Sequence, residues 1–302
     1  MTLNDLPRAK REDISAFRTN DDYMKYSIEL YKEFFAFFSI ITGIEDVCEE
    51  HLDKKKGLVF GVVRKLGNLS LDYLNLLCNG SIDSVHILSR VSKEAMVTVL
   101  LMLKHYDEDK VFEDYIKYSM IIEKKFYNTL IKDENASDLQ GDVVSGKIRE
   151  RMKRSVEEDF QDIGLQVESF DAKKEEKENF WSKTRIDKRF DKVGWSRGYS
   201  SYRLDCHATH SNWSNLYNYF LKLSSDGIIT IRPNKIIAVP QMVLPTILLH
   251  GVVLNAIVEK FVPDCQKKTT LKQYMNLTLE EVERLDEAHE QFLQSNGNRT
   301  RA

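Results

Sequence analysis

The sequence predicts an all-α protein, and three observations lead to this class. Glycine and proline, with 13 and 5 residues among 302, reach about half of their usual combined share of roughly 12%, and every turn-rich architecture needs both. Apolar side chains recur at helical spacing along much of the chain. Apolar residues also make up 42% of the sequence, which is ample for a core and excludes a disordered chain. We therefore expect one mainly helical domain over residues 1–302.

Four helices are predicted in the first half of the chain from apolar residues spaced three and four apart. They cover residues 21–44, 58–77, 84–105 and 110–131. Asn79-Gly80 is a stop signal after the second helix, and Ser81 or Asp83 can cap the third. The short link between these two helices predicts an antiparallel pair.

The segment from residue 133 to about 192 is polar and carries charges of both signs. Such a composition is typical of a solvated face. We expect a charged, partly helical insertion without a core of its own. Helical character returns over residues 199–223.

A small β-hairpin and two helices are expected in the last quarter of the chain. Residues 227–240, GIITIRPNKIIAVP, contain two β-rich runs around Pro233-Asn234, which is the pattern of a hairpin. The helices follow at residues 242–261 and 278–293. The second opens with Thr278-Leu-Glu-Glu, a capping box.

The charge is large but balanced, with 44 basic and 47 acidic side chains and a net charge of −3. This balance argues against a generally basic nucleic-acid coat and leaves room for a local basic site. The four cysteines lie far apart without a CxxC pair, a pattern of reduced thiols. The N-terminus lacks the apolar stretch of a signal peptide. Together these features favour a cytoplasmic protein.

One apolar segment offers an alternative to a soluble protein. Residues 236–258 contain no Lys, Arg, Asp or Glu and are long enough to span a membrane. Prolines and polar side chains interrupt the segment, namely Pro240, Pro245, Gln241, His250 and Asn255. Because polar groups are costly in lipid, a buried core helix is favoured and no membrane contact is expected.

The densest group of reactive side chains lies within residues 199–213. If this stretch is helical, Arg203, His207 and His210 share one face, because steps of four and seven residues rotate by only about 40° and −20°. The neighbouring stripe, with the spacing of a packed seam, holds Tyr202, Cys206 and Trp213.

Three interpretations compete for this group. In the first, Arg203 binds a phosphate through its planar guanidinium while His210 moves a proton, which suffices to cleave RNA by attack of the adjacent 2′-hydroxyl. In the second, Cys206, His207 and His210 bind zinc, but a fourth ligand is missing nearby. In the third, the histidines are buried hydrogen-bonding groups and Arg203 pairs with an acid such as Glu94.

Arg90 and Glu94 are a second polar feature. They lie four residues apart in an otherwise apolar helix, where charge is costly unless it is paired. Either the two form an i, i+4 salt bridge, or Glu94 orients Arg203 or a histidine.

Two motifs in these regions resemble the signatures of a bacterial family, domain-of-unknown-function family 5677. In NGSIDSVHILSRVSKEAMVTVLLML, residues 79–103, a glycine turn leads into a helix with an R-x-x-x-E pair. Tyr202, Cys206 and His210 resemble the second signature, Y-x-x-x-S-x-x-x-H, with cysteine in place of serine. That family is similar in architecture to the HEPN superfamily, helical domains common in toxin-antitoxin and antiphage systems.

The HEPN resemblance implies an activity. Many of these domains cut RNA without a metal through an R-x(4–6)-H motif, and the six residues between Arg203 and His210 match its upper limit. The product would be a 2′,3′-cyclic phosphate. The resemblance also implies a homodimer in which two motifs face a shared cleft, no cofactor, and a possible antitoxin or defence-system partner protein.

The same resemblance implies roles for individual residues. Arg203 would clamp the phosphate and His210 would be the general acid or base. The supporting or substrate-positioning residues would be Tyr202, His207, Asp205, Arg90 and Glu94.

From the sequence we therefore expect a cytoplasmic, metal-independent endoribonuclease with a toxin, antiphage or stress-defence role. The alternative is a non-catalytic HEPN-like module that binds a nucleotide, RNA or a partner protein through the same residues, because a helical fold need not be catalytic.

Overall fold

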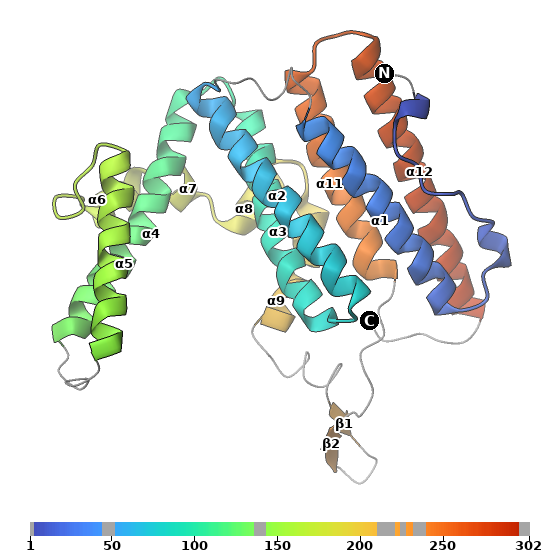
Figure 1. The fold of residues 1–302 in the computed structure, drawn as a ribbon, viewed down its shortest axis with the longest axis horizontal. Helices are drawn as coiled ribbons and strands as arrows, with labels where there is room; N and C mark the ends of the chain where they lie inside the picture. Colours follow the sequence, from blue (N-terminus) through green and yellow to red (C-terminus); the bar gives the residue numbers. More distant parts are fainter. Residues whose placement is uncertain are drawn as a thin grey trace. The chain divides into compact units, whose positions relative to one another are not determined.

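The computed structural model describes residues 3–43, 52–135, 143–209, 221–223, 228–231 and 240–295. These residues are mostly helical, which confirms the predicted all-α class (Figure 1). The chain divides into two compact units. The larger contains Met1–Lys104 and Arg189–Ala302, and the smaller contains His105–Lys188.

Long helices form the framework of the larger unit. They are α1 (Asn20–Thr42), α2 (Lys54–Cys78), α3 (Ile82–Lys104), α11 (Pro240–Phe261) and α12 (Gln266–Ser295). α1 packs against α2, α11 and α12, and α11 also packs against α3. The aromatic stripe that predicts α1 lies in the core between these helices, where Tyr31, Phe34 and Phe37 are buried.

The beginning of α1 and the end of α2 follow their sequence signals. Thr19 and Asp22 form a reciprocal capping box at the start of α1. Gly80 follows α2 with a φ of 69°, in the left-handed region that favours glycine. The N–H groups of Gly80 and Ser81 donate to carbonyls of the last turn of α2, which satisfies that end of the helix. α3 then packs along α2, as predicted.

The charge-free segment contributes helix α11, which starts at Pro240 and contains Pro245. By length and composition alone α11 could cross a membrane. Within the larger unit, however, it packs against α1, α3 and α12, and side chains such as Val243, Ile247 and Leu254 are buried. This is the packing of a core helix.

α12 differs from its prediction, because it is continuous from Gln266 and does not begin near Thr278. Leu271 and Met275 extend its buried stripe upstream. The Thr278 hydroxyl is buried in mid-helix, 2.9 Å from the Glu33 carboxylate and 3.1 Å from the carbonyl oxygen of Tyr274. The predicted capping box was therefore wrong, since the threonine bonds to a neighbouring helix and caps nothing.

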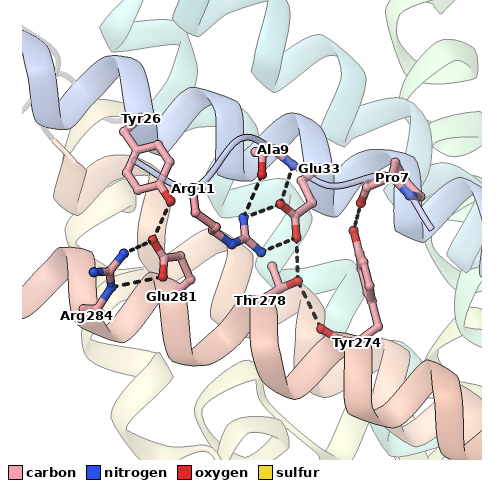
Figure 2. A network of polar contacts seen from close by, with 9 residues as sticks. All are labelled: Pro7, Ala9, Arg11, Tyr26, Glu33, Tyr274, Thr278, Glu281 and Arg284. Carbon is pink, nitrogen blue, oxygen red and sulfur yellow. Dashed lines mark hydrogen bonds and ion pairs between the residues drawn. The ribbon is translucent and has the colours of Figure 1, made fainter. Parts of the chain in front are cut away.

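The segment before α1, residues 3–17, forms a strap across α1 and α12 (Figure 2). It contains the short 3-10 turns η1 (Leu3–Asp5) and η2 (Ile14–Ala16). The side chains of Leu6 and Ile14 are buried, and the Tyr274 hydroxyl of α12 donates to the carbonyl of Pro7. The strap is therefore an integral part of the larger unit.

Two helices and a β-hairpin come before α11 in the sequence, and the first of them, α8, includes the last residues of the smaller unit. α8 (Ile186–Lys192) leads into α9 (Ser196–Thr209), which packs on α3. The helix predicted over residues 199–223 thus starts earlier, and residues 210–220 lie outside the described residues. β1 (Leu221–Leu223) pairs antiparallel with β2 (Ile229–Ile231).

The described strands contain only the first part of the hairpin predicted at residues 227–240. Its first β-rich run forms β2, which pairs with the preceding strand β1, with Leu221 opposite Ile231. The sequence between the two strands includes Ser-Ser-Asp-Gly, which consists of turn-forming residues. It is a turn signal like Pro233-Asn234. Residues 232–239 are not among those described.

The smaller unit contains α4 (Asp109–Asn135), α5 (Val143–Asp162), α6 (Ala172–Glu178) and α7 (Phe180–Lys183). Contrary to the expected solvated insertion, it has an apolar cluster of its own, made of Met120, Tyr127, Val156, Phe160 and Val167. α4 supplies one side of this cluster. The charged segment therefore covers an apolar face of the preceding helix, so the compact unit begins at residue 105 and not at 133.

Candidate functional site

The two regions that carry the predicted signature residues lie against each other in the larger unit, since α9 packs on α3. α9 is short and polar, and it buries Gly198, Tyr202 and Asp205. Gly198 allows the backbone of α9 to lie close to the buried ring of Phe190 in α8, because a Cβ atom at this position would be only 3.2 Å from that ring. With so few apolar side chains on α9, polar contacts hold much of the interface with α3.

The first polar cluster centres on the carboxylate of Glu94 in α3. The Tyr202 hydroxyl donates to Glu94 Oε1 at 2.8 Å, and Arg90 Nε donates to the same oxygen at 3.3 Å. The Arg90 guanidinium also lies over the Tyr202 ring, 5.7 Å from its centroid, a cation–π arrangement. Burial and the hydrogen bond to Glu94 raise the pKa of the Tyr202 phenol. Tyr202 is therefore a neutral hydrogen-bond donor at physiological pH.

The second polar cluster lies around Asp205 and is more deeply buried. Lys93 Nζ donates to Asp205 Oδ2 at 2.6 Å and lies 2.6 Å from Ser201 Oγ. His86 Nδ1 lies 3.0 Å from the other carboxylate oxygen, Oδ1. Lys93 and Asp205 are both only 3% exposed. Since a buried charge is costly unless it is paired, this ion pair ties α9 to α3.

The predicted catalytic residues have different outcomes. Arg203 is exposed on α9, about 100° around the helix axis from the buried Tyr202. Within the described part of the chain it has no hydrogen-bond or ion-pair partner. His207 is half-buried one turn further along α9, and His210 lies outside the described residues.

The structure decides between the pairings predicted for Glu94. Arg90 and Glu94 do pair with each other, as one alternative predicted. The pairing of Arg203 with Glu94 was wrong, because Glu94 binds Tyr202 and Arg90. Asp205, one of the expected supporting or substrate-positioning residues, is paired with Lys93 and belongs to the buried cluster.

Sequence reasoning missed three members of the buried cluster, His86, Lys93 and Ser201. A signal was present, since Lys93 is a charge within an apolar helix and shares a face with His86 seven residues earlier. Its partner on α9 could not be chosen from the sequence, because the approach of α9 to α3 is a tertiary property.

The stripe beside Tyr202 continues to Cys206, which is partly exposed, and Trp213 is not among the described residues. Among the cysteines that the structure describes, Cys78, Cys206 and Cys265 are free thiols. Nowhere in the described ranges do three His, Cys, Asp or Glu side chains gather as metal ligands do. Of the zinc ligands considered, Cys206 and His207 lie on α9, and the position of His210 is not described.

Comparison with protein families matches residues 56–228 to the family of unknown function DUF5677. The match covers more than half of the chain. The chain belongs to DUF5677. No curated protein and no solved structure matches it.

The region matched by DUF5677 contains both halves of the candidate site. It includes the Arg90–Glu94 pair of α3 and Tyr202 of α9. These three side chains are in direct contact. Tyr202 is more than a hundred residues away from Arg90 and Glu94 in the sequence, and the three side chains meet in one cluster at the interface of α3 and α9.

Proposed function

We propose that this protein is a metal-independent endoribonuclease of the HEPN type, with a role in a toxin-antitoxin or antiphage system. The observation that carries the proposal is the position of Arg203. It is exposed on a helix whose other side is tied to α3 by an ion pair and hydrogen bonds. A cation that packing does not use, on a helix that packing holds in place, is suited to binding a phosphate.

The proposed chemistry needs two protein groups. Arg203 would hold the scissile phosphate in its guanidinium fork. His210 would accept the proton of the 2′-hydroxyl, whose oxygen then attacks the phosphorus and displaces the 5′-oxygen of the next nucleotide. The products are a 2′,3′-cyclic phosphate and a 5′-hydroxyl, and the leaving oxygen takes up a proton. The nucleophile belongs to the RNA, so this reaction needs no metal-bound water.

The remaining predicted residues would act around this pair. His207, one turn from Arg203, would contact the RNA backbone. Tyr202, Arg90 and Glu94 would fix the orientation of α9 through the contacts described above. Asp205 would do the same through Lys93, which makes it a positioning residue that does not contact RNA.

Cleavage of a labelled RNA in EDTA tests the proposal directly. The unmodified protein should produce fragments that end in 2′,3′-cyclic phosphate. His210→Ala and Arg203→Ala should each abolish cleavage without changing the melting temperature. Arg64→Ala is a matched control, because Arg64 is an exposed arginine on α2. Activity that survives His210→Ala would refute the catalytic assignment.

A specific observation also supports the non-catalytic alternative. The polar side chains between α3 and α9 are already bonded to each other, Lys93 to Asp205 and Tyr202 to Glu94. Much of this interface therefore has a structural role. In that case the protein would bind RNA, a nucleotide or a partner protein without cutting RNA. Binding of intact RNA with no cleavage, unchanged in His210→Ala, would support this alternative.

The homodimer and the antitoxin or defence partner are part of the same proposal. Two copies of the 35.2 kDa chain would bring two Arg203–His210 pairs to one cleft. Light scattering of the purified protein should then give twice the mass of one chain. A monomer that cleaves RNA at full rate would remove the need for a composite site.

A further inference from the structure

The first half of α5, in the smaller unit, concentrates positive charge. Residues 147–154 read KIRERMKR and contain five Lys or Arg against a single acid, Glu150. The whole chain, in contrast, has a net charge of −3. Local charge of this density is the usual electrostatic signature of a nucleic-acid-binding surface.

Three of these cations form a row along the helix. Lys147, Arg151 and Arg154 are exposed and follow one another at steps of four and three residues, which places them on one face. The row is about 10 Å long, at 1.5 Å per residue. Within the described ranges none of the three is bonded to a carboxylate, whereas the neighbouring Lys153 lies 3.8 Å from Glu150.

The opposite face of α5 is fixed against α4. Val156 and Phe160 belong to the buried cluster of the smaller unit, and the Tyr127 hydroxyl of α4 donates to Glu157 at 2.9 Å. The cationic row lies about 160° to 220° around the helix axis from Val156. It therefore faces away from the core and is carried by an anchored helix.

The apolar surface beside the row favours RNA over a membrane as the partner. Ile148 and Met152 are 46% and 43% exposed, but the main apolar side of α5 is already buried. Binding of an amphipathic helix to lipid grows with the apolar area that it can insert, and two side chains offer little. A nucleic-acid strand, by comparison, carries one negative charge on every phosphate, so each of the three cations can contact a phosphate.

We propose that Lys147, Arg151 and Arg154 of α5 form a docking surface for the phosphate backbone of single-stranded RNA. The choice of RNA rests on the proposed function, while the surface itself rests on charge, exposure and the lack of carboxylate partners among the described residues. Contacts of this kind bind without reading sequence. Their strength falls as the salt concentration rises, because binding releases counterions.

The test compares two triple variants of the full chain in a His210→Ala background, so that cleavage does not disturb binding. K147Q/R151Q/R154Q removes the row. K173Q/K174Q/K177Q is the matched control, because it removes the same charge from exposed lysines of α6 in the same unit, where three glutamates balance the three lysines. Anisotropy of a fluorescent single-stranded RNA gives the Kd at several salt concentrations, and circular dichroism checks the fold.

The row variant should raise the Kd at least about 10-fold and reduce the slope of log K against log salt by about 2, which is roughly 0.7 for each of three lost contacts. The α6 control should change neither. An unchanged Kd and slope in the row variant, or no RNA binding by the parent protein, would overturn the proposal. So would row-dependent binding to phosphatidylserine vesicles with unchanged RNA binding.

Cleavage by the protein with His210 intact is measured separately. RNA binding through α5 without any cleavage would refute the proposed catalysis and leave the docking surface standing. Cleavage with normal RNA affinity in the row variant would refute the docking surface alone.

Discussion

Arg11 donates two hydrogen bonds, of 2.6 and 2.9 Å, to the two oxygens of Glu33, whose side chain has no exposed surface (Figure 2). The backbone N–H of Ala9 donates to Glu33 as well, at 2.7 Å. The strap thus supplies the countercharge of a carboxylate buried on α1, and the hydrogen bonds to Glu33 raise the pKa of Arg11. Arg11 and Ala9 of the strap therefore stabilise the buried side chain of Glu33.

Removing Arg11 should destabilise the protein by about 3 kcal/mol, because it leaves a buried carboxylate without its ionic partner. Chemical denaturation of Arg11→Ala measures this loss. Adding Glu33→Gln should recover part of the stability, since the double variant no longer buries an unpaired charge. If the two substitutions are simply additive, the countercharge role of Arg11 is wrong.

Asp205→Ala should cost about 3 to 5 kcal/mol, because Lys93 would remain buried with its charge unpaired. Replacing both partners, as in Lys93→Met with Asp205→Leu, should be far less harmful than that single change, since no buried charge remains. Urea denaturation of the three proteins gives the comparison. A double variant that is less stable than Asp205→Ala would contradict the account of this cluster.

Two adjacent residues of α9 should differ in their effect on stability, because Tyr202 supports the fold and Arg203 is proposed to bind the phosphate. Tyr202→Phe removes the hydrogen bond to Glu94 and should cost about 1 kcal/mol. Arg203→Ala removes an exposed side chain without a partner among the described residues, and should change stability by less than about 0.5 kcal/mol. Melting curves measure both. A large loss in Arg203→Ala would mean that this arginine supports the fold, and would weaken the proposed catalytic role.

The larger unit should become less stable as the pH decreases, and His250 should be one cause. This residue is buried on α11, and burial lowers its pKa from 6.5 to about 4. Nδ1 lies 2.7 Å from the Thr246 carbonyl and Nε2 lies 3.1 Å from Ser70 Oγ. Since a carbonyl only accepts, Nδ1 carries a proton. The ring is neutral at pH 7 because its pKa is lowered to about 4.

Because the folded pKa is below the unfolded value, the contribution of His250 is complete above pH 6.5 and is lost as the pH falls towards 4. The loss should reach about 3 kcal/mol, at 1.36 kcal/mol per pKa unit. His250→Gln should lack this part of the pH dependence. Denaturation at pH 7 and pH 4 gives the difference between the two proteins, and equal pH dependence in both would show that His250 does not contribute.

The local signals of this chain predicted most of its helices correctly, because capping residues, glycine stops and apolar periodicity act over a few residues. The same locality explains the error at Thr278. A Thr-x-x-Glu pattern is a cap only where the helix begins, and here Leu271 and Met275 continue the buried stripe upstream. The Thr278 hydroxyl instead lies against Glu33, which is 245 residues away in the sequence.

In the candidate site, too, contacts within one helix could be predicted from the sequence, and contacts between helices could not. Arg90 and Glu94 could be paired from the sequence because i, i+4 neighbours on a helix are close in any fold. The partners across the interface could not be paired in this way. Tyr202 with Glu94, and Lys93 with Asp205, meet only because α9 docks on α3.

By itself the sequence determined the helical class, the antiparallel pair around Gly80, and the residue types available for phosphate chemistry. The tertiary structure alone decided which charges are buried and which are free to bind a ligand. It pairs Asp205 with Lys93, pairs Glu94 with Tyr202, and leaves Arg203 exposed. The physical reason is that desolvation and ion pairing depend on which helices pack together, whereas helix formation depends mainly on neighbouring residues.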